Sequence, residues 1–236
     1  MEDEVEKPSW SGKGALLLWV IVFLTTLILF SLIQLYFQET LGVPQGVWVG
    51  LILTEIGVAL ICLTFALFSR KGTLEELGIK RPSVKWLLLA VVLAPVLLVV
   101  ATIAISIQTA LIGEIPYGEE YVRLLVPTTI PALVVWVLID LVFIGPAEEL
   151  FARGVVQTGL QNSLKSEKLS ILLSGLLFGL WHIDPYRIAG VSTAGIGLAY
   201  VYNKSDNNLI VVALLHGLYD AVAMILAFIA LQMGGL

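Results

Sequence analysis

The sequence has few charged residues. Only 13% of its 236 residues are Asp, Glu, Lys or Arg, whereas 58% are hydrophobic, and the mean hydropathy is +0.97. A soluble globular protein of this length carries about twice that share of charge, so the composition excludes that class. Several apolar stretches reach the length of about 20 residues that a helix needs to cross a bilayer. We therefore expect an all-α, polytopic transmembrane helix bundle.

Cysteine and histidine are also scarce. The single cysteine, Cys62, excludes an intrachain disulfide and is expected to be a small buried hydrophobe. His182 and His216 are the only histidines. The net charge of −5 includes an acidic leader at residues 2–6, and nothing in the sequence resembles a basic nucleic-acid site. No small-residue cleavage site follows the leader, so we expect the first apolar helix to remain as an anchor.

The apolar runs predict one transmembrane domain over residues 1–236. It comprises a cytoplasmic tail at 1–14, three N-terminal helices within 15–126 and the catalytic core helices within 127–236. The full-length helices are expected at Ala15–Tyr36, Gly46–Phe68, Val84–Ile112 with a kink at Pro95, Pro131–Leu160 with an interruption at Gly145 and Pro146, and Leu209–Leu231.

Two connections have recognisable features. Thr73 and Glu76 have the spacing of a capping box and Gly78 can end a helix, so a short surface helix is expected there. The connection from Gly113 to Pro127 contains Glu114, Glu119, Glu120 and Arg123 and is expected to lie at the membrane interface.

Two apolar segments are too short to cross the membrane fully. Leu169–His182 and Ala189–Tyr202 have about 14 residues each, or about 21 Å of helix. We expect a membrane-embedded hairpin whose tip, Ile183–Arg187, lies in a cavity or below the far surface. The bundle then has about seven helices, or eight if the fourth long helix is broken.

The positive charges predict the orientation. Of 13 Lys and Arg residues, one face collects all but Arg123, Arg187 and the buried Arg153. Because cytoplasmic loops carry an excess of Lys and Arg, we expect a multi-pass protein of the cell membrane with its N-terminus in the cytoplasm and its C-terminus outside.

Three ionisable groups stand together in an otherwise apolar segment: Glu148, Glu149 and Arg153. Charges at bilayer depth are costly and mark functional sites by default. Glu149 and Arg153 are four residues apart and share a helix face, so they can pair. Glu148 is rotated by about 100° and escapes that partner. We expect Arg153 to keep Glu149 ionised, while Glu148 accepts a proton near neutral pH.

The two histidines lie on other apolar helices. His216 and Asp220 are four residues apart, so the acid can orient the ring, and Phe178, one turn before His182, is expected to pack. If the helices converge, Glu148, His182 and His216 surround one point. That set suits a general base with oxyanion donors, or a divalent metal such as zinc bound by these three residues.

Each of these polar groups could have a structural role instead of a catalytic one. A single buried histidine or an acid near an arginine is commonly structural, but the coincidence of both histidines, paired acids and a buried arginine favours chemistry. Glu55 and Asp140 are weaker candidates. We interpret them as polar links between helices rather than parts of a proton or substrate path.

The three motifs together resemble a known family. Glu148-Glu149-x-x-x-Arg153, Phe178-x-x-x-His182 and His216-x-x-x-Asp220, in this order on separate helices, are similar to those of the CAAX-protease and bacteriocin-processing (CPBP) family of intramembrane proteases, which includes the Rce1-type prenyl-protein endopeptidases. The resemblance covers about residues 140–220. It implies hydrolysis of a peptide bond in a membrane-bound or lipidated protein, with the lipid bilayer as the surrounding medium.

The resemblance also implies roles for single residues. Glu148 would activate water, His182 would position that water, and His216 with the residue at position 220 would stabilise the oxyanion. The eukaryotic prenyl proteases have asparagine at that last position, whereas this chain has Asp220. An ionised aspartate would repel an oxyanion, so Asp220 must be protonated, orient His216 or bind a cation.

Two other functions compete with proteolysis. Some members of the family are linked to immunity against peptide toxins, so a non-catalytic membrane partner is one alternative. A small transporter or proton relay is the other, with buried acids lining a path. Inverted repeats with matching broken helices would support a transporter, and the sequence has neither.

Overall fold

The computed structural model describes residues 10–43, 45–69, 73–113 and 125–234. Every regular element in these ranges is helical, which confirms the all-α prediction. Five helices of the described residues are long and apolar enough to cross a membrane: Gly12–Leu41, Gln45–Phe68, Val84–Ile112, Ile130–Leu164 and Leu209–Gln232. Two shorter helices, Glu167–Trp181 and Ile188–Lys204, make the predicted hairpin.

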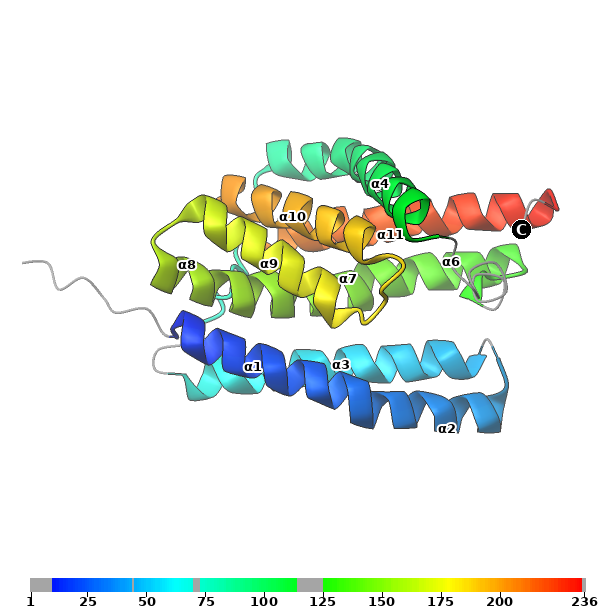
Figure 1. The fold of residues 1–236 in the computed structure, drawn as a ribbon, viewed down its shortest axis with the longest axis horizontal. Helices are drawn as coiled ribbons and strands as arrows, with labels where there is room; N and C mark the ends of the chain where they lie inside the picture. Colours follow the sequence, from blue (N-terminus) through cyan, green and yellow to red (C-terminus); the bar gives the residue numbers. More distant parts are fainter. Residues whose placement is uncertain (1–9, 44, 70–72, 114–124, 235–236) are drawn as a thin grey trace, which may run out of the picture.

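The first two long helices form an antiparallel pair along one side of the bundle (Figure 1). The first consists of α1 (Gly12–Thr25), a π-helical turn η1 (Thr26–Phe30) and α2 (Ser31–Leu41), and the second is α3 (Gln45–Phe68). The first helix is longer at both ends than the predicted Ala15–Tyr36. Helix α3 also contacts α7 (Gly145–Glu149) and thus connects this pair to the core.

The capping box between Thr73 and Glu76 forms, but the predicted surface helix does not. The Thr73 N–H donates to Glu76 Oε2 at 3.1 Å, and the Glu76 N–H donates to Thr73 Oγ1 at 3.2 Å. Gly78 then adopts a φ of 80°, and the Ile79 N–H bonds to Leu74 O at 2.8 Å. Because this backbone hydrogen bond ends the segment after a few residues, the segment is a turn, and the prediction of a surface helix is wrong.

Helix α4 (Val84–Ile112) has the predicted bounds. The Ser83 side chain accepts from the Trp86 N–H and caps its first turn, and Pro95 lies inside a continuous helix. The kink at Pro95 stays a prediction. The expected interfacial connection that follows lies mostly outside the described residues, including Glu114, Glu119, Glu120 and Arg123.

The fourth long helix is continuous over 35 residues, so the predicted interruption at Gly145 and Pro146 is wrong. Its parts are α6 (Ile130–Ile139), η2 (Asp140–Ile144), α7 (Gly145–Glu149), η3 (Leu150–Gln157) and α8 (Thr158–Leu164). The segments η2 and η3 are π-helical. A proline lacks the N–H that an α-helix needs. Here the wider turn of η2, closed by the Gly145 N–H on Asp140 O, precedes Pro146 and lets the helix continue.

This central helix is surrounded by other elements. Its α7, η3 and α8 parts contact α1, α3, α9, α10 and α11 (Figure 1). Helices α9 (Glu167–Trp181) and α10 (Ile188–Lys204) pack closely because Gly175 has no side chain: a Cβ there would lie 2.5 Å from the Ile196 nitrogen. The last helix is α11 (Leu209–Gln232). This packing brings the candidate site residues of three helices together at the centre of the bundle.

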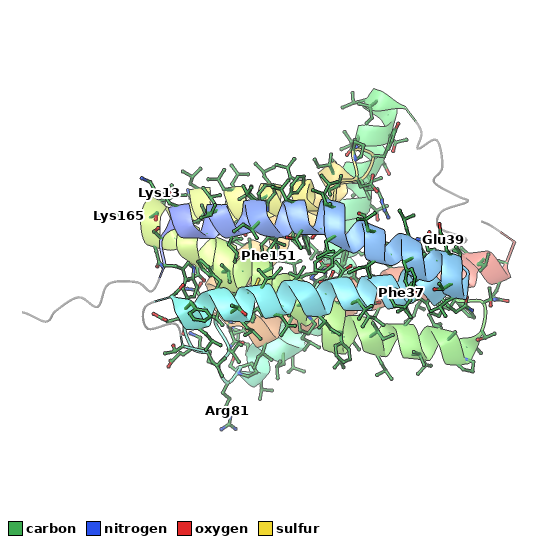
Figure 2. All side chains as sticks on the ribbon, turned by 90° about the horizontal axis from the view of Figure 1, so that it is seen from below. Lys13, Phe37, Glu39, Arg81, Phe151 and Lys165 are labelled. Carbon is green, nitrogen blue, oxygen red and sulfur yellow. The ribbon has the colours of Figure 1, made fainter. Side chains whose placement is uncertain are left out.

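The outer surface of the bundle carries many apolar side chains. Large hydrophobic side chains are exposed along α1–α4 and α6, as lipid-facing helices require. Figure 2 places Lys13 and Lys165 together at one end and Glu39 at the other. The chain is thus a multi-pass membrane protein, and the orientation of its termini stays a prediction from the charge bias.

Candidate functional site

The predicted pair of Glu149 and Arg153 is present and completely buried. Arg153 Nη1 donates to Glu149 Oε1 at 2.7 Å, and both side chains are 0% exposed. Arg153 Nη2 donates to the carbonyl of Gly195 on α10 at 2.7 Å. The guanidinium also lies 4.6 Å from the centroid of the Phe178 ring on α9. Arg153 therefore holds three helices in one arrangement.

Glu149 has a second partner that the sequence analysis missed. His216 Nδ1 lies 2.8 Å from Glu149 Oε1, so the same carboxyl oxygen contacts both Arg153 and His216. Helix α11 reaches α7 because two glycines face each other: a Cβ on Gly145 would lie 3.0 Å from the Gly217 nitrogen. No signal in the sequence indicated this contact, because it depends on the packing of residues 67 positions apart.

The other nitrogen of His216 faces Asp220. His216 Nε2 lies 3.1 Å from Asp220 Oδ2, which confirms the predicted contact between them. A carboxylate can only accept hydrogen bonds, so His216 Nδ1 is the donor toward an ionised Glu149. Asp220, whose side chain is 30% exposed, is more open than Glu149. Asp220 can therefore orient the ring from the wetter side.

His182 is fixed by the carbonyl of Phe178. The two are one turn apart, and His182 Nδ1 lies 2.8 Å from Phe178 O. Because a carbonyl oxygen accepts, Nδ1 carries the proton and Nε2 of the neutral ring is free to accept. The Phe178 ring contacts both imidazoles, with centroids 4.6 Å from His182 and 5.7 Å from His216. Phe178 thus has the packing role that was predicted.

Glu148 faces both histidines without bonding to either. Its Oε2 atom lies 3.6 Å from His182 Nε2 and 3.9 Å from His216 Nε2. Both separations exceed a hydrogen bond, and this buried oxygen has no hydrogen-bond partner in the described structure. A water molecule is the natural partner at such separations. Three helices thus converge on one point, as the sequence predicts.

A cavity of 320 Å³ reaches this point, and we call it the site cavity. Its polar lining includes Glu148, His182, Glu55 and Thr54, and Trp181 forms part of its apolar wall. The His182 side chain is 30% exposed, whereas Glu148 is 11% exposed. The carboxyl that lacks a partner therefore lies at the edge of a space that can hold water.

The predicted metal ligands do not fit a metal centre in this arrangement. Among the described residues, no group of three His, Cys, Asp or Glu side chains could hold a metal ion. The reason lies in His216, whose two ring nitrogens face Glu149 at 2.8 Å and Asp220 at 3.1 Å. His216 Nε2 lies next to Asp220 Oδ2 at 3.1 Å, so in this arrangement it faces that carboxyl and not an ion shared with Glu148 and His182.

Two further buried acids lie near the site. Glu55 on α3 is 4% exposed and Asp140 on η2 is 3% exposed. One carboxyl oxygen of each, Glu55 Oε2 and Asp140 Oδ2, is buried without a hydrogen-bond partner in the described part of the chain. Their interpretation as polar links between helices stays a prediction. The position of Glu55 in the wall of the site cavity was missed by the sequence analysis.

Comparison with known proteins finds a similar family for the segment that contains these residues. A family model described as "Type II CAAX prenyl endopeptidase Rce1-like" matches residues 130–222. Residues 130–222 are thus similar to the Rce1-like family. The match confirms the resemblance predicted from the three motifs, because the Rce1-like segment contains Glu148, His182, His216 and Asp220.

One relative has no assigned function. An uncharacterized protein of Mycoplasma capricolum subsp. capricolum (strain California kid) is 34% identical over 94 residues, which is 38% of this chain and 27% of the relative. The match thus spans about a quarter of that protein's length. No solved structure matches the chain.

Proposed function

We propose that the protein is an intramembrane endopeptidase that hydrolyses a peptide bond of a membrane-associated or lipidated protein. The observation that supports this most strongly is the unpartnered Glu148 oxygen, which faces the Nε2 atoms of His182 and His216 at the edge of a cavity. The Rce1-like segment supports the same class of enzyme.

In this proposal Glu148 is the general base. It removes a proton from a water molecule, whose oxygen adds to the carbonyl carbon of the substrate. The resulting tetrahedral intermediate bears an oxyanion. Glu148 then returns the proton to the leaving nitrogen as the C–N bond breaks, which releases an amine and a carboxylic acid. His182 Nε2, accepting while Nδ1 donates to Phe178 O at 2.8 Å, orients the water.

His216 is the proposed oxyanion donor. In this step His216 is the doubly protonated imidazolium, whose Nδ1–H donates to Glu149 and whose Nε2–H donates to the developing negative charge. Before substrate binds, Asp220 Oδ2 accepts a hydrogen bond from His216 Nε2–H at 3.1 Å and thereby fixes the orientation of the imidazole ring. Arg153 acts indirectly, because it fixes the carboxylate of Glu149 that orients His216.

A cleavage assay tests the proposal. Purified protein in liposomes is given two fluorogenic peptides, one with an S-farnesyl cysteine and one with an unmodified apolar segment. We expect at least one to be cleaved, and Glu148→Gln to lower kcat by at least about a hundredfold, the usual contribution of a general base.

The matched control is Glu167→Gln, which makes the same change at an exposed acid paired with Lys204. This variant should cleave like the wild type. Full activity in Glu148→Gln would refute the proposed mechanism, and cleavage of neither peptide by the wild type would count against the proposed activity.

A further inference from the structure

A second and larger cavity opens beside the site, between α3, α7 and α11. It has a volume of 590 Å³, and we call it the lateral cavity. Its walls are apolar, formed by side chains such as Ile56, Ala59, Phe143 and Leu214, with one carboxyl group among them. That group is Glu55. The lateral cavity is therefore suited to hydrocarbon everywhere except at one residue.

Glu55 lines both cavities. It is part of the wall of the lateral cavity and of the site cavity, where it lies with Glu148 and His182. It is 4% exposed, and its Oε2 atom is buried without a hydrogen-bond partner in the described structure. Glu55 thus lies at the boundary between the apolar lateral cavity and the site cavity, which the proposed base also lines.

An unpartnered buried carboxyl oxygen destabilises a protein unless water or a ligand supplies the missing hydrogen bond. The neighbouring Thr54 is already satisfied, because its hydroxyl donates to Gly50 O at 2.8 Å. A peptide that leaves water for a membrane site has the complementary need, since each of its N–H groups requires an acceptor. A carboxylate is the strongest acceptor that a side chain offers to an N–H.

We propose that Glu55 is a substrate-binding residue that accepts a hydrogen bond from a backbone N–H of the substrate. This rests on the proposed function. The apolar anchor of the substrate fills the lateral cavity, Glu55 binds the adjacent amide, and the scissile bond lies next to Glu148. The substrate class is therefore a peptide with a hydrophobic anchor close to the scissile bond and an unsubstituted amide between the two.

Binding tests this without relying on turnover. The probe is a fluorescein-labelled octapeptide with one S-farnesyl cysteine, together with four copies that are each N-methylated at one peptide nitrogen near that cysteine. Binding is measured by anisotropy with protein in lipid nanodiscs, in a Glu148→Gln background that prevents cleavage. N-methylation at one position should weaken binding about tenfold, as expected for one lost hydrogen bond.

Variants of Glu55 should remove the effect of N-methylation on peptide binding. Glu55→Leu should weaken binding of the parent peptide about tenfold and bind the N-methylated copy equally well. Glu55→Gln keeps an acceptor oxygen, so most of the difference in affinity between the parent and the N-methylated peptide should remain. Glu167→Leu is the matched control, because it makes the same change at an exposed acid that lines neither cavity, and it should leave all affinities unchanged.

Three results would overturn the inference: no binding of the parent peptide, equal affinities for all five peptides, or a Glu55→Leu variant that weakens every peptide by the same factor. Failure of the proposed function looks different. Peptides that bind in the Glu55-dependent way but are never cleaved when Glu148 is intact would refute proteolysis and leave the binding role of Glu55 standing.

Discussion

Replacing Arg153 with methionine is the most informative test of the architecture. The arginine is 0% exposed, pairs with Glu149 at 2.7 Å and donates to Gly195 O at 2.7 Å. Methionine keeps much of the volume but leaves Glu149 buried with only His216 beside it. Removing one partner of a buried ion pair costs about 3–5 kcal/mol because the other charge remains uncompensated. We expect the free energy of unfolding to fall by that amount.

The assay is reversible unfolding in mixed detergent micelles, followed by tryptophan fluorescence and circular dichroism. A second variant, Arg153→Met with Glu149→Leu, removes both charges together. It should be more stable than Arg153→Met alone, because the carboxylate that lost its arginine is removed as well. Its kcat should remain low, because His216 has lost the carboxylate that orients it.

A loss below about 1 kcal/mol in Arg153→Met would show that the pair behaves like an exposed salt bridge, and the reasoning would be refuted. Strictly additive effects in the double variant would refute it too, because additivity is the behaviour of sites that do not interact.

Further predictions concern the residues around His216. Asp220→Asn keeps an acceptor for His216 Nε2 and should retain activity. Asp220→Leu removes that acceptor and should lower kcat at least about tenfold with little change in KM. Equal kcat values in the two variants would contradict the orienting role of Asp220. Gly217→Leu should destabilise the fold by about 1–3 kcal/mol or more, measured by unfolding in detergent, because a Cβ there lies 2.8 Å from Leu141 Cα. Elemental analysis of active protein should find less than one metal ion per chain, and a chelator should leave activity intact; a stoichiometric metal lost together with activity would show that the ligands rearrange.

The parts of the site that the sequence predicted depend on local helix geometry. Residues four apart share a face in any helix, so the pairs Glu149 with Arg153 and His216 with Asp220 follow from spacing alone. Helix lengths were predicted for a similar reason, since a bilayer requires a minimum apolar run. The bounds of α4 are as expected, and the hairpin helices α9 and α10 begin and end within two residues of the predicted positions.

The parts that the sequence did not predict depend on packing. The contact between Glu149 and His216 requires α7 and α11 to approach at Gly145 and Gly217, and spacing along the chain contains no such information. The interruption expected at Pro146 was wrong because a π-helical turn accommodates the proline. Nothing in the sequence distinguishes that turn from a break.

The central claim is that Glu148 activates a water molecule for peptide-bond hydrolysis. Cleavage of the peptide substrates in ¹⁸O-labelled water tests it most directly, with mass spectrometry of the fragments. The account predicts one ¹⁸O atom in the new C-terminal carboxyl group with the wild type, and a rate at least about a hundredfold lower with folded Glu148→Gln. Fragments without the label, or the same labelled product at the same rate in Glu148→Gln, would contradict it.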